Sequence, residues 1–575
     1  MPYTPPVAEQ RFVLDHVVRV GELAATERFA AAADDVVDAV LEGAGQFAAG
    51  EWAPLARVGD TVGAKWTPGG VVMPDGYGQA YRDYVEGGWG TIGVAEEWGG
   101  QGLPFAIQTA VLETLGAANM GFALCPTLTV GAVEALHHHG SPEQQRLYLP
   151  RLATGEWTGT MNLTEPQAGS DVGALRATAT PRGDGTWSIK GTKIYISFGD
   201  HDMAANIVHL VLARTPDAPV GTRGISLFLV PKYRLNDDGE PGEANDVRVV
   251  SIEHKMGLHA SPTCVLSFGD NDDCVGELIG AEHAGMRAMF TMMNNARLNV
   301  GLQGVQVAEG ATQAAVAYAL ERVQSARAGA AGRDPVRIVE HPDVRRMLVR
   351  MKAQTQAARA LVYYAAGQVD RAALGDRAAA MRLEMVTPLA KAHGTDLGNE
   401  VASLGIQVHG GMGYVEETGA AQFFRDARIT PIYEGTNGIQ AADLVGRKLG
   451  LGHNEVEGGA FASLIADMRR EAEHPELVAL IETCEAIGRR LATADADDRF
   501  AASYPFLTML SIAVCGWLME RQGRAATGDD AFATMKRAAT RFYLDQIVPE
   551  ALGLRAAATA SAEVLYATPA EAFAA

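Results

Sequence analysis

Residues 425–440 read RDARITPIYEGTNGIQ, and they contain the most informative carboxylate of the chain. Glu434 follows the apolar pair Ile432-Tyr433 and precedes a glycine. A carboxylate on a mostly apolar wall loses solvation, which should raise its pKa from about 4.3 toward neutrality and suit it to work as a general base. Taken alone, a glutamate before a turn is more often a solvated side chain or a cap, so this prediction depends on its context.

Two segments further upstream are suited to binding a flat polar ligand. Residues 161–171, MNLTEPQAGSD, end a predicted strand in small and polar residues, whose hydroxyls and backbone N–H groups can bind the polar edge of a ring or a phosphate. Residues 193–197, KIYIS, place Tyr195 and Ser197 on one face of a strand, where one can stack on a planar cofactor and the other can hydrogen-bond it. Without context, the first segment also fits a plain strand-to-loop transition and the second an ordinary alternating strand.

The order and the separations of these segments resemble the signatures of the acyl-CoA dehydrogenase family. Residues 161–171 resemble its T-E-P-x-A-G-S-D signature, residues 193–197 its W-I-T/S strand, and residues 425–440 closely match its I-Y-E-G-T stretch. A fourth match, QVHGGMG at residues 407–413, lies just upstream of the third. The resemblance covers about residues 80 to 450. It implies an FAD-dependent enzyme that removes two hydrogens from Cα and Cβ of an acyl-CoA thioester and yields a trans-2-enoyl-CoA.

In this family Glu434 would be the catalytic base. It would remove the α-proton while the β-hydrogen leaves as hydride to flavin N5. The thioester carbonyl would accept hydrogen bonds from the Glu434 backbone N–H and a flavin ribityl hydroxyl, which eases loss of the α-proton. Arg297 would hold the CoA side of the substrate, with Ser170 and Gly435 also in contact with it. A surface arginine on a helix is the alternative for Arg297.

The resemblance also implies a set of residues that contact FAD. Those on the β-domain would flank the isoalloxazine ring and the phosphates, with Tyr195 standing where the family usually has Trp. Arg322 would meet the pyrophosphate, and Gln407, Gly410 and Gly411 would approach the FAD of a neighbouring subunit, which implies at least a homodimer, or a dimer of dimers. The full set is Met161, Leu163, Thr164, Gly169, Ser170, Tyr195, Ile196, Ser197, Arg322, Gln407, Gly410, Gly411, Thr436 and Asn437.

Several departures from the family pattern point to a subgroup. After Arg322 the usual aromatic-glycine pair is replaced by Ser325-Ala326, and an insertion follows through Arg337, which puts the FAD contacts at 325–337 in doubt. Gly438 stands where Gln is common. The GDHD segment at 199–202 and a long C-terminal tail resemble bacterial enzymes that include 3-methylthiopropanoyl-CoA dehydrogenase and broad-specificity long-chain homologues.

The pattern of hydrophobic residues predicts an α+β fold with four domains. These are an N-terminal helical domain (1–156), a central β-barrel-like domain (157–284), a C-terminal four-helix bundle (285–449) and an extra helical domain (450–575). Strands are expected at 158–163, 187–196, 207–213, 225–230, 247–252 and 263–268. Helices are expected at 106–115, from Pro142, and at 343–366, 378–404, 460–473, 475–492, 505–523 and 531–552, with those of the first domain broken by Gly and Pro.

Composition excludes several other classes of protein. The chain has 575 residues and a formal charge of −21, which argues against binding nucleic acid, because phosphate binding needs a basic face. Its five cysteines form no C-x-x-C pair and His137-His138-His139 has no spaced partners, so neither disulfides nor a metal site is expected. We expect no signal segment and no membrane span, and hence a cytoplasmic protein.

Three alternatives stay open from the sequence. An acyl-CoA oxidase would use the same base but pass electrons to oxygen, whereas a dehydrogenase would pass them to an electron-transferring flavoprotein. A non-catalytic relative that binds DNA should have a basic tail, but here the tail mixes signs and Glu434 is present. A long-chain enzyme could dock on lipid through the apolar stretch 505–518, although a core helix explains it as well. The length of the acyl chain does not follow from the sequence.

Overall fold

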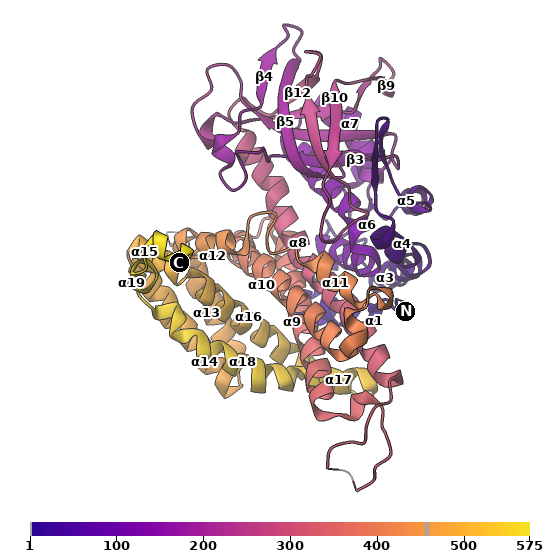
Figure 1. The fold of residues 1–575 in the computed structure, drawn as a ribbon. Helices are drawn as coiled ribbons and strands as arrows, with labels where there is room; N and C mark the ends of the chain where they lie inside the picture. Colours follow the sequence, from indigo (N-terminus) through magenta and orange to yellow (C-terminus); the bar gives the residue numbers. More distant parts are fainter. Residues whose placement is uncertain (1–2, 330, 454, 456–458) are drawn as a thin grey trace. The chain divides into compact units, whose positions relative to one another are not determined.

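The computed structural model describes residues 3–329, 331–453, 455 and 459–575. Its contacts group the chain into two compact units (Figure 1). Unit 1 consists of Tyr3–Leu41 and Arg297–Ala575, and unit 2 consists of Glu42–Ala296. The boundaries expected for the four domains remain a prediction, and this grouping joins Tyr3–Leu41 to Arg297–Ala575.

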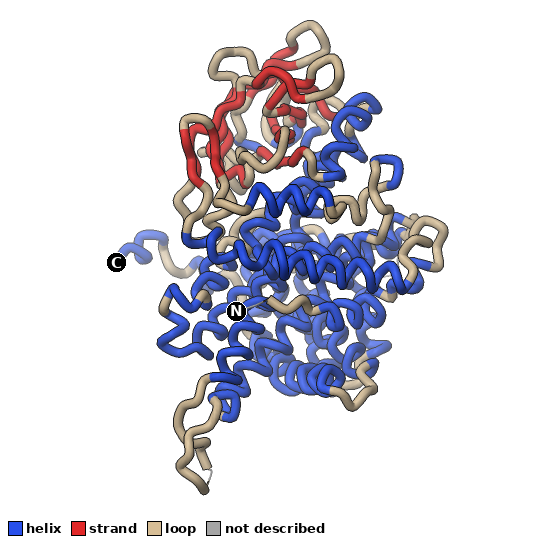
Figure 2. Tube along the Cα trace, turned by 90° about the vertical axis from the view of Figure 1, so that its right-hand side faces the viewer, coloured by secondary structure: helices blue, strands red, loops and turns tan. Residues whose placement is uncertain are grey.

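Unit 2 contains the strands of the chain's large sheet, and Figure 2 shows them gathered in one part of the trace. The sheet has eight strands in the order β10-β11-β5-β12-β7-β6-β3, with β4 paired to β5. Only β3 and β6 run parallel, and the other neighbours are antiparallel. The strands are β3 (Trp157–Asn162), β4 (Thr178–Pro181), β5 (Trp187–Ser197), β6 (Asn206–Ala213), β7 (Ser226–Pro231), β10 (Val247–Ile252), β11 (Thr263–Phe268) and β12 (Val275–Ile279). Small hairpins are formed by β1 (Lys65–Thr67) with β2 (Gly70–Val72) and by β8 (Tyr233–Leu235) with β9 (Pro241–Ala244).

The six predicted strands are confirmed to within about one residue at their ends, because they are runs rich in β-branched and apolar residues. Every residue of β6 and β7 is buried. β4, β8, β9 and β12 were not predicted. β9 reads PGEA, a stretch with little β propensity, and it pairs only with the three-residue β8.

The helices of unit 2 pack on one another and on β3. They are α4 (Ala56–Thr61), α5 (Tyr77–Glu86), α6 (Phe105–His139) and α7 (Pro142–Thr154). The predicted start at Pro142 is confirmed, since the Ser141 hydroxyl accepts from Gln144 N at 3.2 Å in a capping box.

The prediction of helices broken by Gly and Pro is wrong for α6, which continues through Pro126. Asn119 instead leaves helical geometry within it (φ −159°, ψ 87°). The Asn119 side-chain oxygen accepts from Phe122 N at 3.2 Å and so takes the place of a lost backbone bond.

Unit 1 is helical. Its first helices are α1 (Val7–Val13) and α2 (Val20–Ala24), and α3 (Asp34–Phe47) crosses into unit 2. α8 (Gly285–Glu321) enters from unit 2, and the bundle continues with α9 (Pro342–Ala373), α10 (Arg377–His409), α11 (Ala420–Ala427) and α12 (Asn437–Gly446). The predicted helices at 343–366 and 378–404 are therefore confirmed, and each is longer than expected. Residues 459–575 add α13 (Gly459–Glu471), α14 (Pro475–Thr493), α15 (Ala496–Ala501), α16 (Ser503–Ala525), α17 (Ala531–Phe542), α18 (Val548–Leu552) and α19 (Glu563–Tyr566).

The C-terminal extension, residues 459–575, packs directly on the bundle. α16 contacts α9, α10 and α12, and its apolar residues are buried there, including Met509 (0% exposed) and Trp517 (2%). The apolar stretch 505–518 is therefore a core helix, and its buried apolar residues are not available for docking on lipid. The helix predicted at 531–552 is interrupted by a π-helical turn at Tyr543–Ile547, because Pro549 lacks the N–H that would bond back to residue 545.

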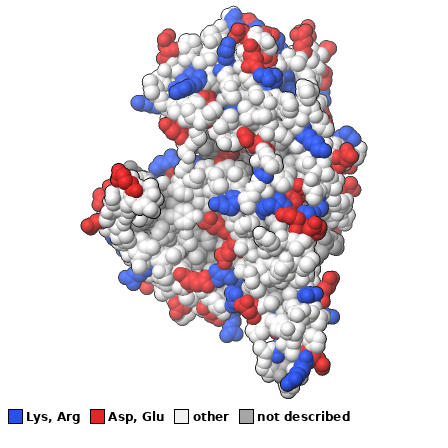
Figure 3. All heavy atoms as spheres, in the orientation of Figure 1, with Lys and Arg blue, Asp and Glu red and all other residues white. Residues whose placement is uncertain are grey.

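Charge and hydropathy add two findings. On the face that Figure 3 shows, basic side chains are interspersed with acidic ones. Among the described residues, one helix, α6, is long and apolar enough to cross a membrane, although no membrane span was expected from the sequence. Because 89% of its most apolar window is buried inside the protein, α6 has the character of a core helix.

Candidate active site

Glu434 lies in the tight turn between α11 and α12. Backbone hydrogen bonds from Ile432 N to Ile429 O (2.9 Å) and from Asn437 N to Pro431 O (3.0 Å) close this turn. Glu434 itself has a φ of 55°, in the left-handed region that few residues other than glycine adopt. Such strain persists only where the surrounding structure holds it, and it is frequent at functional sites.

The surroundings of Glu434 tune its acidity. Burial raises the pKa of its carboxyl group to about 7, and the nearby cations Arg297 and Lys391 oppose part of that rise. Desolvation therefore outweighs two positive charges. A carboxylate with this pKa can take a proton from a weak carbon acid and hold it at neutral pH.

Arg297 is buried rather than on a helix surface, with 7% of its surface exposed. It lies on α8, where burial lowers the pKa of its guanidinium and the charges of Asp443 and Glu434 raise it. Its Nη1 is 4.0 Å from Asp443 Oδ2, and its buried Nε has no hydrogen-bond partner among the residues that the structure describes. A buried donor of this kind is available to an anionic or carbonyl group, so the role of Arg297 in holding substrate stays a prediction.

Lys391 is a buried cation of the candidate site that was not predicted from the sequence. It is fully buried on α10, and its Nζ donates to the Asn437 side-chain oxygen at 2.8 Å. Burial lowers the pKa of Lys391 to about 8, while Glu434 and Asp396 raise it. The available signal was a lysine on the apolar face of the predicted helix at 378–404, since a charge there needs a partner.

The two polar residues after Gly435, Thr436 and Asn437, stabilise the start of α12. The Thr436 hydroxyl caps α12 by accepting from Ile439 N at 3.2 Å, and the Asn437 side chain is 3% exposed. Both side chains thus have partners within the protein, and the nearness of Thr436 and Asn437 to the cofactor stays a prediction. Gly435 has a φ of 81°, where a side chain would be strained.

In unit 2 the two predicted ligand-binding segments lie side by side. Lys193 Nζ donates to Leu163 O (3.0 Å) and Glu165 Oε1 (2.8 Å), and Ile194 N donates to Thr164 O (2.9 Å). Lys193 is fully buried and Glu165 is 4% exposed. This buried ion pair was also missed, because lysine and glutamate usually lie on the surface.

The strand that carries Tyr195 is not a regular one. The pairing of β5 with β11 shifts register between Cys264 and Leu266, and Tyr195 has a φ of 60°. Tyr195 is 61% exposed, and Ser197 is partly exposed. The Ile196 side chain is 3% exposed and lies in the core, so the predicted contact of Ile196 with the cofactor, which stays a prediction, would use its backbone.

The exposed residues of this part of unit 2 suit one kind of ligand. Tyr195 offers an open aromatic face. Ser197, on the same segment, and Thr164 and Ser170, on the adjoining one, are exposed or partly exposed residues that carry hydroxyls. Met161 and Leu163 are partly buried, and Gly169 has open space where a Cβ would stand. This donor set fits a flat heteroaromatic ring with a polar edge and phosphate groups.

Breaking the Lys193–Glu165 pair should destabilise the protein. We expect Lys193→Met to cost about 3–5 kcal/mol, because it leaves a buried carboxylate without its cation. Thermal unfolding checks this. Lys190→Met is the matched control on the same strand, since Lys190 is 62% exposed beside Asp272 and its loss should leave the melting temperature nearly unchanged. Equal melting of the two variants would show that the pair contributes nothing.

A further group of predicted residues lies where α8 and α10 end. The rings of Tyr318 and His409 stack with centroids 4.5 Å apart, one turn before Arg322 and directly before Gly410. Four predicted residues near this point are exposed: Arg322, Gln407, Gly410 and Gly411. The segment after Arg322 leaves and returns through a β-bridge between Val323 and Arg337. The contact of Arg322 with the pyrophosphate, and that of the other three residues with the FAD of a neighbouring subunit, stay predictions.

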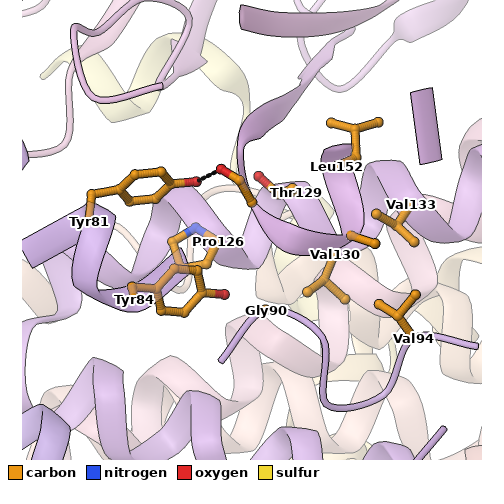
Figure 4. A pocket seen from close by; sticks show the side chains of 11 residues that line it. Tyr81, Tyr84, Gly90, Val94, Pro126, Thr129, Val130, Val133 and Leu152 are labelled. Atoms are coloured by element: carbon orange, nitrogen blue, oxygen red, sulfur yellow. Dashed lines mark hydrogen bonds between the residues drawn. The ribbon is translucent and has the colours of Figure 1, made fainter. Parts of the chain in front are cut away.

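Unit 2 also encloses a small, mostly apolar cavity between α5, α6 and α7, with Tyr81, Tyr84 and Thr129 among its lining residues (Figure 4). The Tyr81 hydroxyl donates to Gly155 O at 2.8 Å at its edge. Its free space suits about one water molecule, so it is a packing defect rather than a substrate site. Among the described residues, no group of three or more His, Cys, Asp and Glu side chains is placed to hold a metal ion.

Four protein-family models match consecutive parts of the chain. Three are described as the N-terminal, middle and C-terminal domains of acyl-CoA dehydrogenase, and they match residues 36–156, 160–271 and 283–449. The fourth is described as acetyl-CoA dehydrogenase C-terminal like and matches residues 461–569. The extension is therefore a domain type of its own.

Several curated proteins match most of the chain, and two of them are informative for the subgroup. The 3-methylmercaptopropionyl-CoA dehydrogenase of Ruegeria pomeroyi is 44% identical over 96% of this chain and 97% of its own length. The broad-specificity linear acyl-CoA dehydrogenase FadE5 of Mycobacterium tuberculosis is 33% identical over 83% of this chain and 84% of its own length. Among solved structures, Caenorhabditis elegans ACDH-11 in complex with C11-CoA superimposes with a TM-score of 0.76, covering 95% of this chain and 92% of that one. At 21% sequence identity, this superposition shows that the two proteins share a fold.

Proposed function

The chain belongs to the acyl-CoA dehydrogenase family, and on that premise we propose that it is an FAD-dependent enzyme that converts an acyl-CoA thioester to its trans-2-enoyl-CoA. The family indicated by the four motifs is thereby confirmed, together with the subgroup that carries a C-terminal extension. The observation that carries the proposal is Glu434, held in a strained turn with a pKa raised to about 7.

Glu434 has the chemistry that the first half of the reaction needs. Its carboxylate takes the α-proton, and its raised pKa lets it hold that proton at neutral pH. As the α-proton leaves, negative charge develops on the thioester oxygen, to which the Glu434 backbone N–H would donate. FAD, when bound, supplies the acceptor for the β-hydrogen, which leaves as hydride, so that one proton and one hydride are removed in all.

The residues of unit 2 support the cofactor assignment. The open ring of Tyr195 and the hydroxyls of Thr164, Ser170 and Ser197 fit the isoalloxazine edge and the phosphates of FAD. Tyr195 replaces the tryptophan expected from the family pattern, so it offers a smaller stacking surface. The exposed Arg322 supports the proposed contact with the pyrophosphate.

Substrate and partners follow from the relatives as proposals. The relative from R. pomeroyi is named for a propanoyl thioester with a methylthio substituent, so 3-(methylthio)propanoyl-CoA is the first substrate to test. We further propose a homodimer or dimer of dimers, with an electron-transferring flavoprotein as acceptor and the cytoplasm as location. Oxygen as the direct acceptor is the alternative, and the rate of reoxidation in air separates the two.

An anaerobic visible spectrum of the purified protein tests the proposal. We expect a yellow protein whose flavin band bleaches on addition of some acyl-CoAs, from 3-(methylthio)propanoyl-CoA and butanoyl-CoA to long chains, and returns only slowly in air. A colourless protein that stays so after FAD is added would overturn the cofactor assignment. A yellow protein that no thioester bleaches would overturn the substrate class, and fast return of the band in air would favour the oxidase.

A further inference from the structure

The C-terminal extension contacts the helix that begins immediately after the catalytic turn. α12 starts at Asn437, three residues beyond Glu434, and it packs against α15 and α16 on one side and α10 on the other. The two elements pack in ordinary contact here, since a Cβ added at Gly446 would meet the Phe500 ring at 3.4 Å. The extension therefore forms part of the support of the catalytic turn.

A chain of hydrogen bonds runs from the extension to the cation beside Glu434. We call it the relay, and it consists of Tyr504, Asp396, Asn437 and Lys391. The Tyr504 hydroxyl donates to Asp396 Oδ2 at 2.7 Å, and Asp396 Oδ1 accepts from Asn437 Nδ2 at 2.8 Å. The Asn437 side-chain oxygen in turn accepts from Lys391 Nζ at 2.8 Å.

The relay orients each of its members. The Asn437 amide also donates to Ala392 O (3.1 Å) and approaches Thr395 Oγ1 (3.0 Å), so both ends of this amide have a fixed direction. Burial raises the pKa of Asp396, while its bonds to Tyr504 and Asn437 and the charges of Lys391 and Arg428 lower it. An ionised Asp396 thus depends on the hydroxyl that the extension supplies.

We propose that the relay makes the C-terminal extension a positioning element for the reaction at Glu434. Lys391 lowers the free energy of the ionised base by its charge, and the relay keeps that charge in place. Tyr504 and Asp396 act through their neighbours, so they are positioning residues rather than catalytic ones. This inference rests on the proposed role of Glu434 as base.

The groups that face Glu434 come from several elements. Arg297 lies on α8 and Lys391 on α10, and both favour the ionised carboxylate. Asp443, on α12, and Arg447, the residue directly after that helix, act on the pKa of Arg297 with opposite signs. A change confined to the relay therefore alters one of the two cations and leaves Arg297 with its own partners.

The test is a pH titration of Glu434 in Tyr504→Phe. An infrared difference spectrum against the Glu434→Gln variant isolates the carboxyl band of Glu434 and gives its pKa without turnover. We expect the pKa to rise in Tyr504→Phe by an amount that lowers the ionised fraction about threefold below pH 7, with a matching fall in kcat/KM there. Lys391→Met should give about tenfold or more, and Lys391→Arg should recover most of it, since an opposite charge at this range is worth about one unit or more.

Tyr566→Phe is the matched control, because this tyrosine is also on the extension but is 71% exposed. It should titrate as the unchanged protein does. Tyr504 is 39% exposed, so its variant retains the fold and decides the question even if Lys391→Met does not fold. An unchanged Glu434 titration in Tyr504→Phe overturns the relay. A protein that no acyl-CoA bleaches overturns the proposed function instead, while the infrared titration still reports on the relay.

Discussion

Glu434→Gln should retain FAD and lose turnover by about 10³–10⁴-fold, the size of effect expected when a positioned general base is removed. The amide has nearly the same shape as the carboxylate, so the turn between α11 and α12 keeps its geometry, yet the amide cannot accept the α-proton. The measurement is the anaerobic rate of flavin bleaching by the best acyl-CoA, together with the visible spectrum of the purified variant.

The pH profile gives the same prediction a second form. Because burial raises the pKa of Glu434 to about 7, the unchanged protein should lose kcat/KM about tenfold for each pH unit below that value and reach a plateau above it. The residual rate of the variant should lack this acid limb. Glu476→Gln, an exposed glutamate at the start of α14, is the matched control and should behave as the unchanged protein. Bleaching by Glu434→Gln within about threefold of the normal rate would refute the base.

The parts of the fold that sequence predicted well are those with a strong period. β6 and β7 are continuous apolar runs, and α9 and α10 repeat their apolar residues at helical spacing. The type of each element and its buried residues therefore follow from the local sequence. β9 and the π-helical turn at Tyr543–Ile547 carry no such period and were missed. The conformation of β9 depends on its pairing partner, which a local pattern does not contain, and the π-helical turn depends on Pro549, which the spacing of apolar residues does not register.

The site divides in the same way. Glu434 was predicted because its neighbours in the chain are apolar, and its raised pKa agrees with that argument. Lys391 and Asp396 were missed because each looks like an ordinary charged residue on a helix until α10, α12 and α16 come together. Asn437 was assigned to the cofactor by motif position, whereas its amide is buried between those helices. Motif position identifies the residue but not the direction of its side chain.

A second buried network ties the two ends of the chain to the bundle. Arg359, on α9, donates to Glu309 Oε2 at 2.7 Å and lies 3.5 Å from Glu9 Oε1, while Lys536 donates to Glu9 at 2.6 Å. Arg359 and Lys536 are each 1% exposed, Glu309 is 5% and Glu9 is 9%. Glu9 and Lys536 are 527 residues apart in the chain, so no local pattern could have paired them.

Arg359→Met should therefore cost about 3–5 kcal/mol of stability in unit 1, because two buried carboxylates lose a shared cation. Thermal unfolding should show a fall in Tm of about 5 °C. The pKa of Glu309 is lowered to about 2, by Arg359 and Lys352 against the opposing effect of burial, which is the largest single influence. A depressed carboxyl pKa stabilises the fold above its ordinary value of 4.5, and that stabilisation is lost as pH falls from there toward 2. The difference in stability between Arg359→Met and the unchanged protein should shrink in the same pH window.

Arg346→Met is the control on the same helix. Arg346 is 49% exposed beside Asp343, so its replacement should cost under about 1 kcal/mol. If both variants melt together at neutral pH, the cost of desolvating Arg359 cancels its attractions, and the network fixes the position of the chain ends without adding to stability.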